Sequence, residues 1–210
     1  MQTSREENHS EQTQLGPKTN ITAEELNQLP LRAFSGKVTL ITDASKLAAA
    51  VKEIEKHDVL GFDTETRPSF KRGQSFKVAL LQLAVPNKVF LFRIHQTGLP
   101  DEITSIFENT DIIKAGVAIH DDIKALQKIN KFQPVSFIEL SAMAKASGLQ
   151  VESVKKLAGL LLGFRISKSA QTSNWEAPSL TDKQIEYAAT DAWVCLEIFK
   201  KLKGRKVHSH

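Results

Sequence analysis

Carboxylates recur in three short segments of this 210-residue chain. Asp63 and Glu65 stand in Gly-Phe-Asp-Thr-Glu-Thr, and Asp122 ends the stretch Gly-Val-Ala-Ile-His-Asp-Asp. Asp191 lies in Tyr-Ala-Ala-Thr-Asp-Ala, four residues after Tyr187. Carboxylate oxygens suit Mg²⁺ or Mn²⁺, and two such ions about 3.5–4 Å apart can stabilise both the attacking and the leaving oxygen of a phosphodiester displacement. The four acids and the tyrosine together predict a two-metal nuclease site.

Each segment alone has a simpler reading. An acidic pair such as Asp121 and Asp122 can merely favour the positive end of a helix dipole. A lone tyrosine such as Tyr187 is most often a half-buried core residue. Asp191 is harder to dismiss, because it lies within an apolar run where an unpaired charge would cost several kcal/mol. His120 is expected to lie at the surface or behind the ligands, since hard metal ions prefer oxygen.

Hydrophobic periodicity predicts alternating strands and helices. The predicted strands are Lys37–Ile41, Val59–Asp63, Lys77–Val85, Lys88–Ile94 and Ile112–Gly116. The predicted helices are approximately 43–56, 101–109, 120–128, 138–146, 153–162 and 181–203. These elements indicate an α/β fold, a mixed β-sheet flanked by α-helices in a single domain.

The predicted elements position the acids. Asp63 and Glu65 are two residues apart at the end of a strand, so they point to one side of it. Asp122 falls at a strand-to-helix junction. Tyr187 and Asp191 are four residues apart on the last helix, so they share a face.

The chain ends are expected to differ from this core. Residues 1–30 are polar and predict a disordered or loosely docked segment, residues 31–203 the exonuclease domain, and residues 204–210 a basic tail. No apolar run approaches the length of a membrane span, and no signal segment is recognised. We therefore expect an intracellular protein, cytoplasmic and nucleoid-associated in a bacterium or nuclear in a eukaryote. The single cysteine, Cys195, has no disulfide partner within the chain.

The chain carries 28 basic and 24 acidic residues, a formal net charge of +4. Because several acids are candidate metal ligands, the remaining surface is more basic than this total suggests, which suits a nucleic-acid partner. Phosphate contacts would give affinity without sequence preference. The candidate nucleic-acid-binding residues are Thr64, Arg67, Lys71, Arg72, Lys168 and Asn174.

The three blocks Phe62–Glu65, Gly116–Asp122 and Tyr187–Asp191 resemble the DEDD superfamily of 3′→5′ exonucleases. The resemblance is to the tyrosine branch, with its Werner-type and ribonuclease D-type nuclease domains, and it extends from about Phe34 to Leu202. It implies a ribonuclease-H-like fold and release of nucleoside monophosphates from a 3′ end. It also implies two ions, Mg²⁺ or Mn²⁺, held by Asp63, Glu65, Asp122 and Asp191, with Tyr187 orienting the attacking water.

Two alternatives stay open at this point. The favoured substrate is DNA with a free 3′ end, but RNA 3′-end trimming would use the same acids. A non-catalytic nucleic-acid-binding module could keep the fold, although it has no need for all four carboxylates and the tyrosine. We expect a stand-alone nuclease module. Its oligomeric state does not follow from the sequence.

Overall fold

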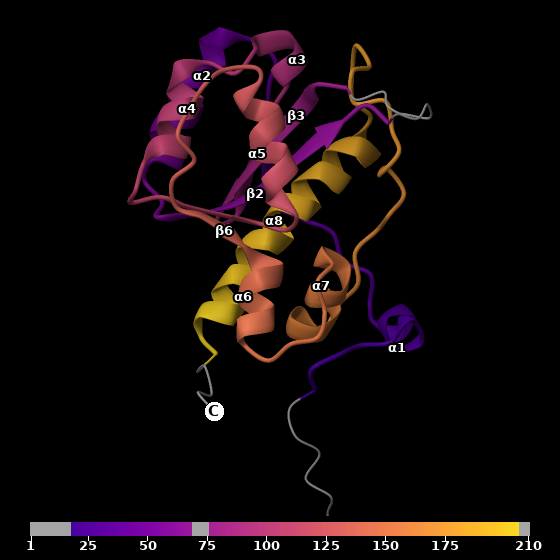
Figure 1. Cartoon of the computed structure of the whole chain (residues 1–210). Helices are drawn as coiled ribbons and strands as arrows, with labels where there is room; N and C mark the ends of the chain where they lie inside the picture. Colours follow the sequence, from indigo (N-terminus) through magenta and orange to yellow (C-terminus); the bar gives the residue numbers. More distant parts are fainter. Residues whose placement is uncertain (1–17, 69–75, 206–210) are drawn as a thin grey trace, which may run out of the picture.

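A six-stranded mixed sheet forms the centre of the molecule, and helices cover both of its faces (Figure 1). The computed structural model describes residues 18–68 and 76–205. The strand order is β1-β4-β3-β2-β5-β6, in which β3 is antiparallel to both neighbours and the other adjacent pairs are parallel. The strands are β1 Lys37–Ile41, β2 Val59–Thr66, β3 Val78–Val85, β4 Lys88–Phe92, β5 Ile113–Gly116 and β6 Phe137–Glu139. The predicted α/β class is thereby confirmed.

The helices are mostly those that the periodicity predicted. A short 3-10 turn, Ala44–Lys46, precedes α2. The α-helices are α1 Ala23–Gln28, α2 Leu47–Ile54, α3 Ile94–Thr97, α4 Asp101–Glu108, α5 Ile119–Gln127, α6 Leu140–Ala146, α7 Val154–Leu162 and α8 Asp182–Lys203. Helices α1 and α3, of six and four residues, were not predicted. In the ranges 18–68 and 76–205, no helix is both long and apolar enough to cross a membrane.

One predicted helix was wrong in its first turn. The run 138–146 was expected to be helical throughout, but Phe137–Glu139 form strand β6, and α6 begins only at Leu140. Strand β6 pairs in parallel with β5, with Ala115 opposite Ile138. That pairing partner is distant in sequence, so helical periodicity within the run could not reveal it.

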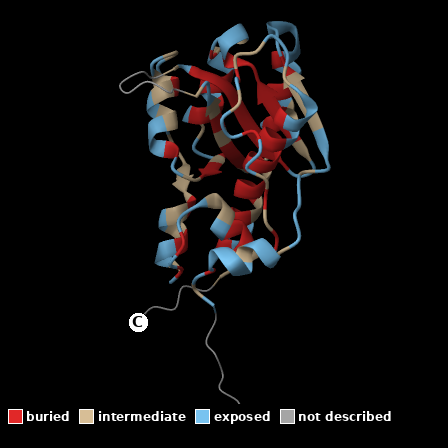
Figure 2. Ribbon diagram, turned by 90° about the vertical axis from the view of Figure 1, so that its right-hand side faces the viewer, coloured by how far each residue is buried: buried red, intermediate tan, exposed pale blue. Residues whose placement is uncertain are grey.

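Alternate residues of β2 serve two different layers. Leu60 and Phe62 are fully buried in the core beneath α2, α4 and α5. Gly61, which lies between them, faces α8 instead. A β-carbon at Gly61 would lie 1.9 Å from the Ala192 carbonyl oxygen. Figure 2 shows that the buried residues concentrate in this sheet and the adjoining helix. The carboxylate-bearing end of β2 is therefore pressed directly against α8.

Helix α8 is the longest element, with 22 residues. It begins with the predicted capping box, in which Thr181 and Gln184 each bond to the other's backbone N–H. Small residues at Ala188, Ala189 and Ala192 are fully buried and allow the helix to approach the sheet closely. This close packing fixes the height of Asp191 above β2.

The described part of the N-terminal segment, residues 18–34, packs along α7 and α8. Ile21 is buried, and the Leu26 side chain lies against Gly159 of α7. The backbone N–H of Arg32 donates to the Arg165 carbonyl oxygen at 2.9 Å. Residues 18–30 are thus docked through α1. Residues 1–17 and 206–210, which include most of the expected end segments, lie outside the described residues.

Replacing Gly61 by alanine should destabilise the fold by about 1–3 kcal/mol, because the added methyl group would meet the α8 backbone rather than a movable side chain. Urea unfolding would measure the loss. Gly204→Ala is the matched control, since the nearest atoms to its new methyl group would be 3.7 Å away. Equal stability of the two variants would contradict the close β2–α8 contact.

Candidate active site

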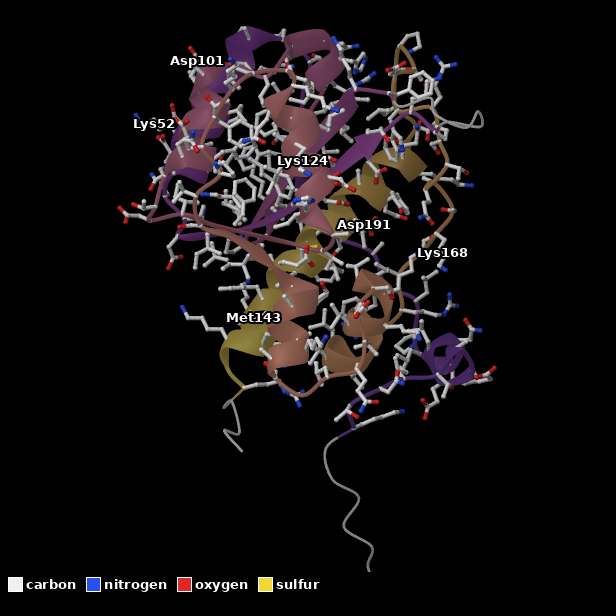
Figure 3. The ribbon with its side chains drawn as sticks, in the orientation of Figure 1. Lys52, Asp101, Lys124, Met143, Lys168 and Asp191 are labelled. Carbon is white, nitrogen blue, oxygen red and sulfur yellow. The ribbon has the colours of Figure 1, made fainter. Side chains whose placement is uncertain are left out.

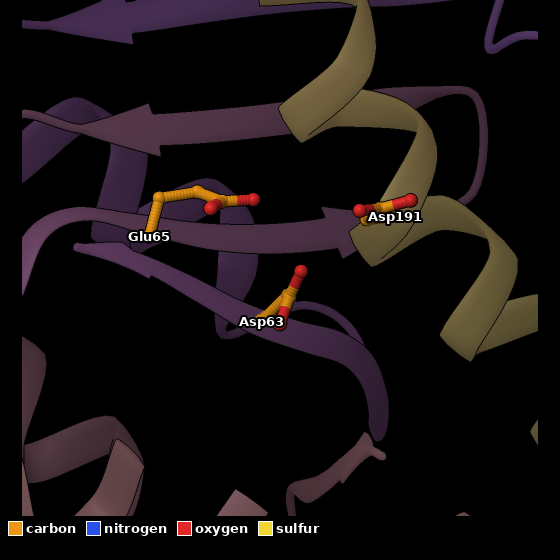
Figure 4. A group of neighbouring side chains, drawn as sticks. All are labelled: Asp63, Glu65 and Asp191. Atoms are coloured by element: carbon orange, nitrogen blue, oxygen red, sulfur yellow. The ribbon is translucent and has the colours of Figure 1, made fainter. Parts of the chain in front are cut away.

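Three carboxylates converge where β2 meets α8. Asp63 and Glu65 project from the same side of β2, and Asp191 projects toward them from the middle of α8 (Figure 4). One carboxylate oxygen from each residue lies within 4.8 Å of those of the other two. Asp63 and Glu65 are two residues apart on β2, whereas Asp191 is over 120 residues further along the chain. The contact between β2 and α8 brings the three together.

Burial and mutual repulsion disfavour the charged forms of these acids. Burial, followed by the charge of Asp191, raises the pKa of Asp63 well above its usual range. The same two causes raise the pKa of Glu65 to about 9, and burial raises that of Asp191 to about 6. Asp191 Oδ1 is buried and has no hydrogen-bond partner among the residues that the structure describes. An all-oxygen donor set with such an unpaired atom fits a divalent cation such as Mg²⁺ or Mn²⁺.

Asp122 lies beside this trio but not within it. It occupies the first turn of α5, where its Oδ1 accepts a 2.6 Å hydrogen bond from the Thr64 hydroxyl. Thr64 stands between Asp63 and Glu65 on β2, so its side chain points to the opposite side of the strand. Burial raises the pKa of Asp122 to about 6, and the charge of Asp122 in turn raises the pKa of Glu65. Thr64, a candidate nucleic-acid contact, therefore connects β2 to Asp122.

Glu139 supports the position of Asp122, although the sequence patterns did not predict it as a site residue. Its two carboxylate oxygens accept hydrogen bonds, each 3.0 Å long, from the backbone N–H groups of Ala118 and Ile119. These N–H groups lie at the start of α5, the helix that carries Asp122, and have no acceptor within the helix itself. Ala118 adopts a left-handed conformation with φ of 58°. The role of Glu139 was not predicted because residues 138–146 were expected to form one continuous helix. In the structure a strand ends at Glu139 and a helix follows it.

Tyr187 lies one turn before Asp191 on α8 and is 8% exposed. Its ring packs against Trp175 with 6.0 Å between ring centroids. Interaction with its hydroxyl lowers the pKa of Asp191, partly opposing the effect of burial. The pKa of Tyr187 itself is raised, first by burial and then by the charges of Asp191 and Glu65. The hydroxyl is consequently a donor at neutral pH.

The candidate nucleic-acid contacts divide into separate groups. A guanidinium nitrogen of Arg67 lies 3.6 Å from a carboxylate oxygen of Glu176, and the guanidinium lies over the Phe76 ring. Asn174 accepts a hydrogen bond from the Glu176 backbone N–H. These contacts join the end of β2 to the segment before α8. Lys71 and Arg72 lie outside the described residues.

Lys168 follows α7 in the chain and lies to the right of and below Asp191 in Figure 3. Its charge lowers the pKa of Lys155, on the first turn of α7, where burial is the larger cause and brings that pKa to about 8. The charge of Asp191 acts on Lys155 in the opposite direction. Lys155 was not singled out from the sequence, since nothing in its local pattern distinguishes it from the neighbouring Lys156. Lys155 lies near Asp191 because α7 packs against α8.

A cleft with a volume of about 420 Å³ opens at the acids. Asp63 and Asp191 line it, and the start of α7 contributes Ser153 and Val154. Cys195 also lines the cleft, and burial raises the pKa of its thiol. His120 is exposed and lies beside Asp121, as expected for a residue outside the ligand set. The site is therefore a group of buried and half-buried acids, two of which line a cleft bordered by the start of α7.

Comparison with known proteins gives consistent results at three levels. Residues 38–205 match the family model described as 3′-5′ exonuclease. The mouse bifunctional 3′-5′ exonuclease/ATP-dependent helicase WRN is 34% identical over 186 residues, which cover 84% of this chain and 13% of that protein. The exonuclease 3′-5′ domain-containing protein 2 of Drosophila melanogaster is 32% identical over 160 residues, which cover 72% of this chain and 27% of that protein. This chain thus spans a minor part of the length of either relative.

Solved structures share the fold. The EXO domain of Aedes aegypti Nibbler superposes with a TM-score of 0.73 at 24% identity, covering 84% of this chain and 91% of that one. Escherichia coli RNase D gives a TM-score of 0.73 at 23% identity, covering 80% of this chain and 44% of that one. The family match covers most of the chain, including all four acids and the tyrosine, and the expected ribonuclease-H-like sheet is present. This chain belongs to the 3′-5′ exonuclease family of the DEDD superfamily.

Proposed function

We propose that this protein is a metal-dependent 3′→5′ exonuclease that hydrolyses the terminal phosphodiester bond of nucleic acid and releases nucleoside monophosphates. The observation that carries the proposal is the convergence of three buried or half-buried carboxylates within 4.8 Å. Asp122 lies beside them. A non-catalytic module would gain nothing from so many buried acids, because their repulsion disfavours the folded state unless cations are bound.

In this proposal the four acids hold two divalent ions, Mg²⁺ or Mn²⁺. Asp63 would contribute to holding both ions, Glu65 and Asp191 would help to hold the first, and Asp122 would help to hold the second. Bound ions would lower the pKa of the attacking water and stabilise negative charge at the departing 3′ oxygen. The protein's contribution is to hold the carboxylates in place: β2 and α8 fix three of them, while Thr64 orients Asp122.

Tyr187 is assigned to orienting the attacking water. The raised pKa of its hydroxyl makes Tyr187 a poor base at neutral pH. Its main role is therefore hydrogen bonding to the water, and proton transfer is secondary. Packing against Trp175 limits the movement of its ring. Lys155 and Lys168 are proposed to contact substrate phosphates, and Arg67 is a further candidate.

The preferred substrate is DNA with a free 3′ end, and RNA trimming is the alternative. Relatives point in both directions, since they include the DNA polymerase I of Aquifex aeolicus and an Escherichia coli enzyme described as an exoribonuclease. A Trypanosoma brucei RNase D has been solved in complex with RNA U12. The proposed setting is an intracellular compartment that contains such 3′ ends.

Digestion of matched DNA and RNA oligonucleotides, each labelled at its 5′ end, tests the proposal. We expect a ladder of products that shortens from the 3′ end, requires Mg²⁺ or Mn²⁺ and stops when EDTA is added. Faster digestion of DNA would support the preferred substrate. Full activity in excess EDTA, or initial release of the 5′ label as a mononucleotide, would overturn the proposed function.

Asp63→Ala and Asp191→Ala should each lower turnover by about 10³-fold or more, because each removes a metal ligand. The fold should persist, and the melting temperature of the metal-free protein should stay the same or rise, since each change relieves carboxylate repulsion. Circular dichroism and oligonucleotide digestion on the same samples measure both effects. An unfolded Asp63→Ala protein would instead indicate a structural role for that residue.

Tyr187→Phe removes one hydroxyl and almost no volume. If the hydroxyl orients the attacking water, kcat should fall by about 10²-fold while KM changes little. A tyrosine that only fills the core predicts nearly unchanged kcat with a small shift in melting temperature. Measuring kcat, KM and melting temperature on this variant separates the two readings.

The metal-free protein should lose stability as the pH rises. The acids have ordinary pKa values near 4, whereas those of Asp191 and Glu65 are raised to about 6 and about 9. An acid with a raised pKa binds its proton more tightly in the folded state, so deprotonation between about pH 4 and pH 9 destabilises the fold. Mg²⁺ binds the deprotonated acids, so its stabilising effect should be larger at pH 8 than at pH 5. Melting curves with and without Mg²⁺ measure this difference, and the Asp191→Ala variant should show less of it.

A further inference from the structure

Gln82 is a buried amide in the middle of the sheet. It lies on β3, is 0% exposed and is enclosed between the strands and α8. Neither its Oε1 nor its Nε2 has a hydrogen-bond partner within the described ranges 18–68 and 76–205. Buried side-chain amides are nearly always paired, because an unpaired donor loses its hydrogen bonds to water without replacement. Such a residue calls for a functional reason.

The strand register places an acidic side chain directly opposite Gln82. Gln82 is directly opposite Asp63 on β2 and Leu91 on β4. Directly opposed residues of an antiparallel pair project to the same face, with β-carbons about 4.5–5.5 Å apart. Along β3, the neighbours on that face are Leu80 and Ala84. Of these four flanking side chains, only that of Asp63 can accept a hydrogen bond.

The helix above offers few alternatives. In the same cluster, α8 contributes the methyl groups of Ala188, Ala189 and Ala192 and the ring of Tyr187, and its backbone groups are paired within the helix. The Tyr187 hydroxyl interacts with Asp191, and methyl groups cannot satisfy an amide. A glutamine side chain is long enough to span the gap to a directly opposed residue, so rotation of its terminal amide would bring Nε2 to the Asp63 carboxylate.

We propose that Gln82 is a positioning residue for Asp63: when divalent cations bind, its Nε2–H donates a hydrogen bond to the Asp63 carboxylate and holds it in the orientation that binds them. This inference rests on the proposed function, in which Asp63 would contribute to holding both ions. Carboxylates that bind metals are themselves usually hydrogen-bonded, and loss of such a partner typically weakens metal binding by about 10–100-fold. A neutral amide supplies this contact without adding a further charge to the buried acids.

Gln82→Met tests the inference, because methionine keeps the length and shape of the side chain but cannot donate a hydrogen bond. Leu91→Met is the matched control, since it alters packing on the other side of Gln82 and leaves the amide in place. Titration calorimetry with Mn²⁺ measures metal affinity directly, without reference to turnover. We expect the Mn²⁺ dissociation constant to rise about 10–100-fold in Gln82→Met and to stay near the wild-type value in Leu91→Met.

The melting temperature of metal-free Gln82→Met should equal or exceed that of the wild type, since an unpaired buried amide is removed. A purely structural role predicts the reverse, a lower melting temperature with unchanged Mn²⁺ affinity. Equal Mn²⁺ dissociation constants in the wild type and Gln82→Met would overturn the inference. Failure of the wild type to bind Mn²⁺ at all would instead overturn the proposed function, so the two failures are distinguishable.

If Gln82→Met does not fold, the wild-type protein still provides a test. The Gln82 side-chain amide protons can be followed by nuclear magnetic resonance during addition of Mg²⁺, which is diamagnetic. A hydrogen bond to Asp63 should shift one amide proton downfield and slow its exchange with water. Unchanged shift and exchange at saturating Mg²⁺ would overturn the inference.

Discussion

Close contact between β2 and α8 is the constraint on which the site depends. Gly61 allows the backbone of α8 to lie directly on the strand, and the alanines of α8 present no bulk on the facing side. Two residues further along β2, the same contact brings a carboxylate oxygen of Asp63 within 4.8 Å of one of Asp191. A larger separation would relieve the repulsion between these acids, but it would also remove the arrangement that can bind cations.

Apolar packing therefore opposes electrostatic repulsion throughout the site. Most of α8 around Asp191 is buried, and the hydrophobic free energy of that surface keeps the helix in place against the cost of enclosing the acids. Proton binding relieves part of this cost, which explains the raised pKa values of Asp63, Glu65 and Asp191. Cations would relieve it in a second way, so protons and metal ions compete for the same group of oxygens.

Much of this arrangement could be predicted from the sequence. The bounds of β1 and the capping box of α8 were predicted correctly, because strand periodicity and N-cap chemistry are local signals. What could not be predicted depends on contacts between distant segments. Strand β6 required its pairing with β5, and the support that Glu139 gives to α5 required β6. The proximity of Lys155 to Asp191 likewise follows from helix packing and not from any motif.

The segment before β1 has a consequence for where the folding unit begins. The family match starts at residue 38, yet the Phe34 backbone N–H donates to the hydroxyl of Thr190, the residue adjacent to Asp191. Ile21 and Leu26 meanwhile cover Gly159 on α7, the helix that also borders the cleft. A protein trimmed to the matched residues would expose that apolar surface and lose a tether on the helix that carries Asp191. The segment matched by the family and the segment that packs as one folding unit therefore begin at different residues. The folding unit is the longer of the two.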